Sequence, residues 1–561
     1  MSEPIAELTS QIYVKRAGSV VQNTIMVRLT ELVVDQHCQM PNMFMLRFQD
    51  RELQLIDEGI FDLHEEIEIG ATINNKPSRL MSGIITAIEP SFSAEGSVEL
   101  VVRGYDKSIQ LYREPKSRAY RNSRDSDIAQ KIAGEAHLRS SVQATSITYE
   151  HIYQNNKTDL AFLQERAWRI GYEVYVKGDT LYFQPPKGNQ SVGAKLTWGE
   201  NSLSIRPRIS VSEKVDEVQI RGWDAKTQKP LIGRSKNGDL MPKISSGKQI
   251  QDNDSSHYSL VVTDLVPTNQ NEANLLADAR MNERSGAFLE VEGSVFRRPD
   301  VEAGTTIELD GIGERFSGEY LVTSATHSYS ASAGLYTRFT VRGLRSGLLT
   351  EQMAHLAPVQ KYNSPVTAIV SNNKDPQGWG RVRLNFPWLE EKLESDWARV
   401  SYPGAGAETS GFEIIPAVND EVIVIFEHGD FNRPLVIGSL YNGKNKASQS
   451  AHDSKDDPAE IRQWRSKKGH VITLHDKHGQ EKVEVQSNGG HQILLDDKSG
   501  DLEINAAGGQ KITLAKSGEV TIEGKSVKVK SSGQLSLESG SNMNIKANGK
   551  LDIKGSIINL N

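Results

Sequence analysis

Apolar residues near the C-terminus come in pairs whose two members lie two positions apart. Within "GKSVKVKSSGQLSLESGSNMNIKANGKLDIKG" (524–555), each pair begins eight residues after the pair before it. A period of two predicts strands, and the Gly, Ser and Asn residues between the pairs predict turns. Such a strand cannot bury itself, so the pattern predicts a stack of many units or winding with partner chains. The pairs are Val527/Val529, Leu535/Leu537, Met543/Ile545 and Leu551/Ile553.

The same doublets begin earlier in the chain, at irregular spacings that settle to eight only later. Turn signals such as "SNGG", "DKSGD" and "AAGG" lie between them, so each doublet predicts one short strand. The series ends at Ile558/Leu560. The earlier doublets are Ile472/Leu474, Val483/Val485, Ile493/Leu495, Leu502/Ile504, Ile512/Leu514 and Val520/Ile522.

The first 345 residues mix strand patterns with three amphipathic helices. "DSDIAQKIAGEAHL" and "TDLAFLQERAWRIG" each place apolar residues on one helical face. Thr158 or Asp159 can cap the second helix, and Gly171 can end it. The next segment, 172–184, predicts a hairpin that turns at Gly178-Asp179, and the third helix is predicted over 271–284.

Short strand patterns return in residues 358–442, where Pro and Gly turns separate them. The segment predicts a small Greek-key barrel. A polar stretch, "GKNKASQSAHDSKDDPAEI" (443–461), follows and predicts a linker.

Composition narrows the class of protein. With 561 residues the chain is too long for one core and predicts several domains. A net charge of −7 argues against a dominant role in nucleic-acid binding. No apolar run reaches the roughly 18–20 residues of a membrane span, and the first residues lack the pattern of a secretory signal. The single cysteine, Cys38, excludes an intrachain disulfide framework and is interpreted as a plain buried thiol.

The sequence offers little candidate chemistry, and it predicts no catalytic residues and no cofactor. "GSLYNGKN" (438–445) approaches a phosphate-binding loop, but Asn445 stands where Ser or Thr would hold magnesium. His470, His475 and His478 cluster where the doublets begin, and solvated or hydrogen-bonded histidines are favoured over a metal site. The lysines of 524–555 are favoured as part of a solvated face of mixed charge over a surface for anionic lipid.

Several stretches resemble VgrG-like hub–spike proteins of contractile injection systems, in which a phage late-control-type hub is fused to a tail spike. The most specific stretches are "DPQGWGRVRLNFPW" (375–388), "WARV" (397–400) and "IPAVNDEVIVIFEHGDFNRPLVIGSLYN" (415–442). Weaker stretches support them: "SDIAQKIA" (126–133), "NNKTDLAFLQERAWRIGYEVYV" (155–176) and "FSGEYLVTSATHSYSASAGLYTRFTVRG" (316–343). Their order along one chain makes the resemblance specific.

The resemblance implies a mainly β chain with a few helices, in which a hub precedes a small barrel and a needle. In this family three chains wind into an intertwined β-prism, whereas a single-chain parallel β-helix, with about 24 residues in each coil, is the structural alternative. The implied domains are a first hub β-barrel (1–110), a helical and hairpin hub segment (111–194), a second hub barrel with one helix (195–357), an OB-fold barrel (358–442), a linker (443–465) and a β-prism spike (466–561).

The resemblance also implies a function, that of a structural hub and membrane-puncturing spike rather than an enzyme. The implied partners are two further copies of the chain, a hexameric inner tube and baseplate proteins at the hub, and effector cargo. A tip protein of the Pro-Ala-Ala-Arg repeat (PAAR) type is expected at Ile558 and Leu560, and the target is a cell envelope. In a trimer three copies of His470 could meet on the axis. No nucleic-acid partner is expected.

Other interpretations remain beside this one. The opening residues look more like those of extracellular, phage-tail-like particles than like those of type VI secretion, so we expect a chain made in the bacterial cytoplasm and released within a particle. A VgrG of a type VI system or a phage tail spike is the alternative. A β-repeat adhesin would need a secretion signal, and a peptidoglycan hydrolase would need a domain where only the linker lies.

Overall fold

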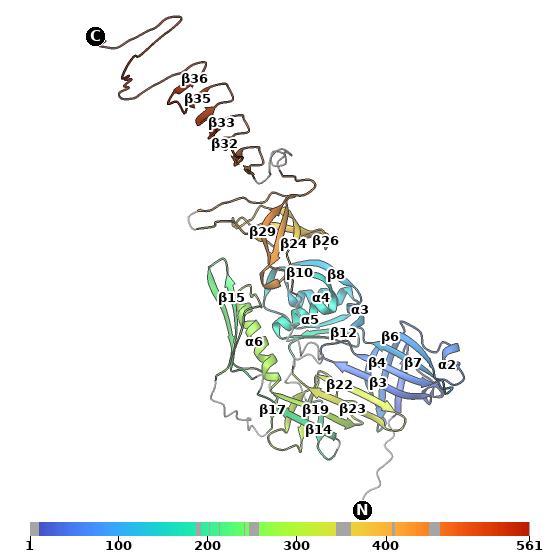
Figure 1. The fold of residues 1–561 in the computed structure, drawn as a ribbon. Coiled ribbons are helices and arrows are strands. Elements are labelled where there is room, and N and C mark those ends of the chain that lie inside the picture. Colours follow the sequence, from blue (N-terminus) through green and yellow to red (C-terminus); the bar gives the residue numbers. More distant parts are fainter. Residues whose placement is uncertain are drawn as a thin grey trace, which may run out of the picture. The chain divides into compact units, whose positions relative to one another are not determined.

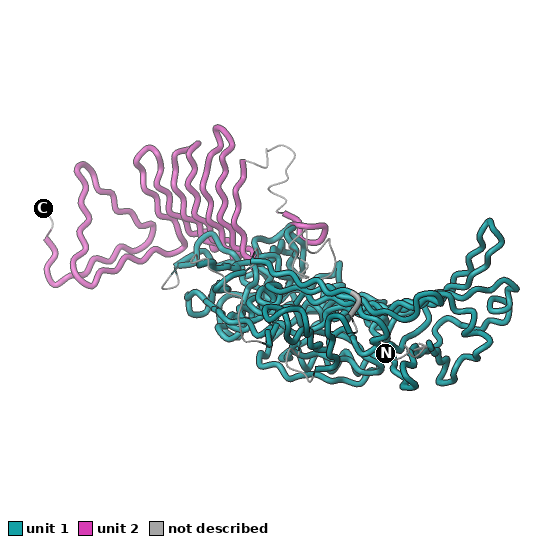
Figure 2. Tube along the Cα trace, turned by 90° about the horizontal axis from the view of Figure 1, so that it is seen from below, with its two compact units in different colours: residues 1–440 teal, residues 441–561 magenta. Residues whose placement is uncertain are grey.

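The structure is a computed structural model, and it describes residues 11–186, 192–200, 202–211, 214–240, 242–245, 257–343, 361–406, 410–447 and 460–559. The chain divides into two compact units, Met1–Leu440 and Tyr441–Asn561 (Figure 2). Among the described residues, strands dominate, and no helix has the length and apolar character needed to cross a membrane.

An eleven-stranded antiparallel sheet forms the base of the first unit. Strand β3 pairs with β22, so the sheet continues from the predicted first hub barrel into the predicted second (Figure 1). In spatial order its strands are Ser202–Ile209 (β14), Leu289–Phe296 (β19), Gly334–Val341 (β23), Ser324–Ser330 (β22), Leu29–His37 (β3), Met43–Gln49 (β4), Val98–Tyr105 (β7), Lys76–Phe92 (β6), Glu66–Ile73 (β5), Gln11–Arg16 (β1) and Ser19–Val20 (β2).

Two separate cores lie along this sheet. The first is built around Leu32, Phe44 and Phe48, all fully buried, and short helices at Asn23–Met26 (α1) and Gln54–Asp57 (α2) lie beside it. The second core includes Phe339 and Tyr320 and joins the sheet to a smaller four-stranded sheet. The strands of the smaller sheet, in order, are Ala194–Thr197 (β13), Thr306–Asp310 (β20), Gly318–Leu321 (β21) and Lys243–Ile244 (β17).

The middle of the hub holds the first two predicted helices, and both are confirmed. They are Asp125–Glu135 (α4) and Asp159–Ile170 (α5), which follow the short helix Ile109–Tyr112 (α3). The Thr158 hydroxyl accepts a hydrogen bond from the Ala161 N–H at 3.2 Å, and Gly171 ends α5 with a φ of 70°. The neighbouring strands are Pro115–Arg124 (β8) and Thr148–Thr158 (β10), which pair with each other, and Arg139–Val142 (β9), Glu173–Lys177 (β11) and Thr180–Gln184 (β12).

The predicted hairpin and the third helix are also confirmed. Strands β11 and β12 pair as an antiparallel hairpin, and the helix is Gln270–Gly286 (α6). It packs on a three-stranded sheet of Lys229–Ser235 (β16), Glu217–Asp224 (β15) and Ser259–Val262 (β18). Gly233 of β16 lies so close to the backbone of Ala273 that a Cβ atom would collide with its carbonyl oxygen, which explains the glycine there.

The predicted small barrel closes the first unit. Its core surrounds Phe386, Phe426 and Phe431. In spatial order its strands are Glu390–Glu394 (β26), Arg383–Phe386 (β25), Val366–Asn372 (β24), Glu421–Phe426 (β28), Pro434–Leu440 (β29) and Arg399–Val400 (β27), and a single 3-10 turn, Glu427–Gly429 (η1), follows β28.

The second unit is a meander in which seven short strands pair antiparallel in chain order (Figure 1). Each doublet from Ile472/Leu474 to Val520/Ile522 lies on one strand, as predicted. The antiparallel pairing differs from the parallel β-helix considered as an alternative. The strands are Ile461–Arg465 (β30), Val471–His475 (β31), Lys482–Gln486 (β32), Gln492–Asp496 (β33), Asp501–Asn505 (β34), Lys511–Leu514 (β35) and Val520–Glu523 (β36).

The turns of this meander repeat one design. In four of them the N–H of the first residue donates to the carbonyl of the fifth at 2.8–2.9 Å, over 466–470, 487–491, 506–510 and 515–519. The fourth residue has a φ between 85° and 91°, which only glycine adopts readily. These glycines are Gly469, Gly490, Gly509 and Gly518.

The octads 524–555 differ from the prediction. Their doublets predict strands, but the described chain contains no strand after Glu523. A strand exists only when its backbone groups find a neighbour. Within one chain, these octads have none.

Candidate functional site

The seven-stranded meander carries an apolar face built by its register. Each doublet residue stands opposite a doublet residue of the next strand, so two apolar ladders cross the sheet. One ladder is Trp464, Ile472, Val485, Ile493, Ile504, Ile512 and Ile522. The other is Leu474, Val483, Leu495, Leu502, Leu514 and Val520.

This apolar face is open in the single chain. Apart from Leu502, its members are between 36% and 62% exposed, whereas Thr473 on the opposite face is 5% exposed. Covering each side chain would stabilise the needle by on the order of 1 kcal/mol. A contiguous apolar surface of this kind marks a site of association.

The opposite face of the meander is mostly polar, although it includes Val471 and Leu494, and its polar side chains bond within the chain. Lys511 Nζ donates to Glu503 Oε1 at 2.7 Å, and Asn505 Nδ2 donates to Gln492 Oε1 at 3.2 Å. The hydrogen bond from Lys511 lowers the pKa of Glu503. Side chains on one face of the sheet therefore hydrogen-bond to one another, and the apolar face is the one that a partner surface could bury.

The octads continue the apolar pattern without pairing. Val529, Leu537 and Ile545 are between 65% and 69% exposed. The Ser531 hydroxyl donates to the Gln534 carbonyl at 3.0 Å, and the same bond recurs eight residues later between Ser539 and Asn542. The repeat is thus present in the local turns, while the backbone between the turns lacks strand partners.

The predicted tip contact is only partly within the described residues. Ile558 is 49% exposed, and Leu560 lies outside the described ranges. The contact of Ile558 and Leu560 with a tip protein therefore stays a prediction.

The three clustered histidines do not converge within one chain. His470 directly precedes β31, His475 is its last residue, and His478 lies in the turn that follows. His470 Nδ1 accepts the N–H of Asn488 at 3.3 Å, and His475 Nε2 lies 3.9 Å from a carboxylate oxygen of Glu484. In the part of the chain that the structure describes, no three His, Cys, Asp or Glu side chains form a metal-binding group.

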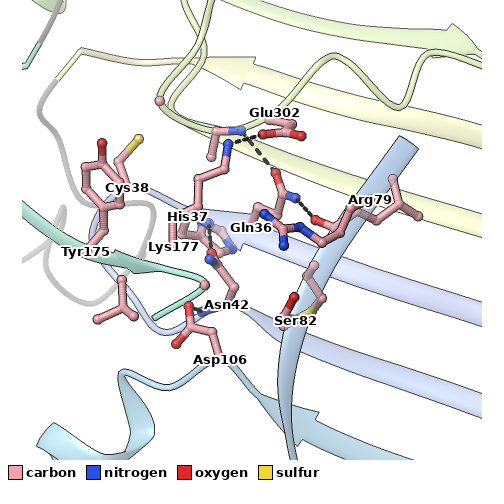
Figure 3. Close-up of a pocket in the computed structure, with 16 residues that line it drawn as sticks. Gln36, His37, Cys38, Asn42, Arg79, Ser82, Asp106, Tyr175, Lys177 and Glu302 are labelled. Carbon is pink, nitrogen blue, oxygen red and sulfur yellow. Dashed lines mark hydrogen bonds and ion pairs between the residues drawn. The ribbon is translucent and has the colours of Figure 1, made fainter. Parts of the chain in front are cut away.

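The hub contains a cavity of about 200 Å³ where β3, β6, β11 and the loop 302–304 meet (Figure 3). Gln36, which is buried, bridges two of these parts: its Nε2 donates to the Leu80 carbonyl at 2.7 Å, and its Oε1 accepts the Ala303 N–H at 3.2 Å. Lys177 and Glu302 form an ion pair of 2.6 Å at the rim. These bonds tie the first barrel and the hairpin to the second barrel.

Two further side chains that line the cavity, those of Asp106 and Cys38, also have neighbours within the chain. Asp106 accepts hydrogen bonds from the N–H groups of Asn42 and Ser108, both at 3.0 Å, and burial raises its pKa to about 6. Burial also raises the pKa of the Cys38 thiol, which lies 3.7 Å from the Val322 carbonyl. A protonated thiol is a poor nucleophile. The cavity is therefore a structural joint between the barrels.

Strand β10 fixes the small barrel to the hub. Tyr153 of β10 is buried in the core of the small barrel, with its ring 5.2 Å from that of Phe431, and its N–H donates to Asn432 Oδ1 at 2.7 Å. Beside it, His151 Nε2 lies 3.0 Å from the Glu394 carbonyl oxygen. The hub and small barrel thus share a core residue, in keeping with their membership of one compact unit.

Buried ion pairs connect the three helices of the hub. Arg166 of α5 pairs with Asp125 of α4 at 2.6 Å, and Arg169 pairs with Glu272 of α6 at 3.0 Å. Burial would raise the pKa of Glu272, but Arg169 and hydrogen bonds from Thr268 outweigh it and lower the pKa to about 2. Sequence reasoning missed these pairs. The available signal was two arginines three residues apart on the helix that the apolar pattern buries.

The fold described here is that of a hub, an OB-type barrel and a repeat-built needle on one chain. Residues 10–331 match the family model described as the Alg8 N-terminal domain, and residues 366–441 match the type VI secretion system/phage-baseplate injector OB domain. The chain belongs to the Alg8 N-terminal domain family, whose model matches more than half of it. The OB-domain match, together with the VgrG relatives reported next, confirms the resemblance to VgrG-like hub–spike proteins.

Individual relatives agree with this assignment. The spike protein VgrG3 of the Vibrio cholerae type VI secretion system is 25% identical over 349 residues, 54% of this chain and 32% of that protein. VgrG1c of Pseudomonas aeruginosa is 31% identical over 157 residues, 24% of this chain and 21% of its own. The chain thus spans between a fifth and a third of these two curated relatives.

A solved structure supports the fold. The lidded Francisella PdpA–VgrG complex contains a chain that matches with a TM-score of 0.51 and 12% identity, over 88% of this chain and 80% of that one.

Proposed function

We propose that the chain is the central hub and spike of a contractile injection system and that it acts as a homotrimer. The observation that carries the proposal is the apolar face, with the unpaired octads that follow it. Both need partner surfaces, and two further copies of the same chain would supply the same doublets at the same spacing.

A trimer explains the octads better than a single-chain coil does. A β-helix closed within one chain would pair its own octads, but the described chain leaves them without strands. Winding with two other chains would give the backbone groups partners and cover the doublets. The resulting needle would be rigid, because opening it locally breaks contacts to two neighbours.

The hub would form a ring at the end of the inner tube, and contraction would drive the needle into a target envelope. The role is mechanical, and effectors would be carried by the particle rather than made active by this chain. The shared core residue Tyr153, which joins the hub to the small barrel, supports force transmission between them.

The needle would end in a PAAR-type tip protein bound at Ile558 and Leu560. Replacing both residues with Asp should abolish binding of such a tip protein in a pull-down with the full chain. A matched control places Asp at Ser556 and Asn559. Tip binding that survives the Ile558 and Leu560 double change would overturn this contact.

We propose further that the particle is of the extracellular, phage-tail-like type, with a type VI VgrG as the alternative that the relatives fit equally well. Particles pelleted from the producing bacterium's culture fluid should contain this chain. Finding it only in complexes held at the cell membrane would favour the type VI alternative.

Electron microscopy of the purified full-length chain tests the hub–spike proposal. We expect a ring with threefold symmetry and one needle. Single-chain particles without a needle would contradict it.

A further inference from the structure

The needle's C-terminal segment differs in charge from the rest of the chain. Residues 524–555 contain six lysines and two acidic residues, a net charge of +4, although the whole chain carries −7. The meander before it, 460–523, holds nine basic and ten acidic residues. A net positive charge is therefore confined to the C-terminal segment of the needle. The lysines are Lys525, Lys528, Lys530, Lys546, Lys550 and Lys554.

These lysines are placed by the octad. Lys530, Lys546 and Lys554 occupy the same octad position, directly after the second apolar residue, and Glu538 takes that position in the remaining octad. Neighbouring residues of an extended segment point to opposite sides, so a lysine next to the doublets points away from them. The octad repeat therefore predicts a row of positive charge along the outside of the needle.

The structure shows these side chains to be accessible. All six lysines are exposed. Among the described residues, the one ion pair made by these lysines joins Lys550 and Asp552, 2.9 Å apart. The acidic residues therefore neutralise little of the segment, unlike the mixed face that the sequence pattern favours.

We propose that this segment binds the anionic headgroups of phospholipid membranes. Each lysine near an anionic bilayer adds to its attraction, and four to eight clustered lysines are typical of such binding. The proposal rests on the proposed function in one respect only: a trimer would carry three copies of the six lysines.

The composition of the segment favours a membrane over a nucleic acid. Residues 524–561 contain no Arg, Phe, Trp or Tyr. Proteins that bind single strands stack bases on aromatic rings, and arginine is the usual reader of base edges. Lysine is a compact point charge that suits a diffuse anionic surface.

Flotation with lipid vesicles tests the proposal on the full-length chain. The vesicles hold phosphatidylcholine alone or with about a third phosphatidylglycerol, at about 50 mM and about 500 mM sodium chloride. The test variant carries Lys528→Gln, Lys530→Gln, Lys546→Gln and Lys554→Gln. The matched control changes four exposed lysines of the meander, so both variants have the same net charge. Its substitutions are Lys467→Gln, Lys468→Gln, Lys498→Gln and Lys516→Gln.

The chain should float with the anionic vesicles at low salt and not with phosphatidylcholine alone. The test variant should lower the bound fraction at least about tenfold, and the control variant should bind like the unchanged chain. Sodium phosphate should release no more chain than sodium chloride of equal ionic strength, because single phosphate groups are not the ligand.

Three results would overturn the proposal: no binding to the anionic vesicles, an equal loss in both variants, or release by phosphate alone. Binding to duplex DNA that is as tight as binding to vesicles and depends on the same four lysines would assign the segment to nucleic acid instead. Light scattering of each variant reports the trimer separately, so failure of the lipid proposal is distinguishable from failure of the proposed function.

Discussion

The hub and the needle use apolar residues in opposite ways. In the hub, Phe44 and Phe48 are fully buried and Phe339 is 1% exposed, each within a core of its own chain. In the needle, Ile493 and Leu495 are about two-fifths exposed, although their alternation is as regular as in any hub strand. An alternating strand pattern therefore does not predict whether the same chain or another chain covers the apolar face. In the hub the chain covers its own apolar face, and in the needle the proposed trimer would cover it.

The largest effect should come from the needle. Replacing Ile493 and Leu495 together with Asp should reduce the mass in solution to one third, because two charges in each of three chains would be buried at the shared axis. Light scattering of the full chain measures it. The matched control is Glu484→Gln with Glu503→Gln on the polar face, which should leave the mass unchanged. A trimer in the Asp variant would mean that the apolar face is not the contact between chains.

A cavity in the hub core should cost less, and it should act within one chain. Phe339→Ala should lower the free energy of unfolding of the hub by about 3–5 kcal/mol, the usual cost of removing a buried aromatic ring. Chemical denaturation followed by tryptophan fluorescence measures the change. Phe92→Ala, at a ring that is 64% exposed, should change it by less than about 0.5 kcal/mol. Equal effects at the two positions would break the contrast between hub and needle.

A buried histidine gives the hub a pH dependence. His327 of β22 is fully buried, and burial lowers its pKa from 6.5 to about 4. Between these values the unfolded chain binds a proton that the folded chain does not, so this term lowers stability as the pH falls from 6.5 to 4. The term amounts to roughly 3 kcal/mol in all.

His327→Gln should remove that dependence. The measurement is the free energy of unfolding of variant and unchanged chain at each pH, because the raised pKa of Asp106 acts in the opposite direction in both. As the pH falls from 6.5 to 4, the free energy of unfolding of the unchanged chain should decrease relative to that of the variant. Replacing the exposed His478 with Gln is the control for losing a histidine, and a constant difference for His327→Gln would contradict the assignment.

The smallest effect concerns a helix end in the hub. Thr158→Ala removes the hydroxyl that accepts the Ala161 N–H and should lower stability by about 1 kcal/mol. Thr158→Ser keeps the hydroxyl and should recover most of the loss. A shift in the denaturant midpoint measures both, and a loss in Ser as large as in Ala would show that the methyl group matters instead.

Local patterns in the sequence predict much of this structure. The three long helices, the hairpin at Gly178, the strands from β31 to β36 and the small barrel follow from periodicity and turn residues, which act over a few residues. The pairing of β3 with β22 does not, because Asp35 and Thr326 are 291 residues apart and neither strand carries a sign of its partner. The same holds for Gln36 and for the buried pair of Arg169 with Glu272.

The needle shows a different limit. Its doublets predict strands throughout, yet strands stop at Glu523 in one chain. The pattern of apolar residues predicts which side chains are to be buried. Whether a segment forms a strand depends on whether a neighbouring strand is present to pair with it. The candidate contact at Ile558 and Leu560 rests on resemblance and remains a prediction.

In the proposed trimer, the needle holds the three chains together. Light scattering of the full chain and of a chain lacking residues 466–561 tests it most directly. We expect a mass three times the 62.1 kDa of one chain for the full chain, and the mass of a single truncated chain once the needle is removed. A folded, full-length monomer would contradict it.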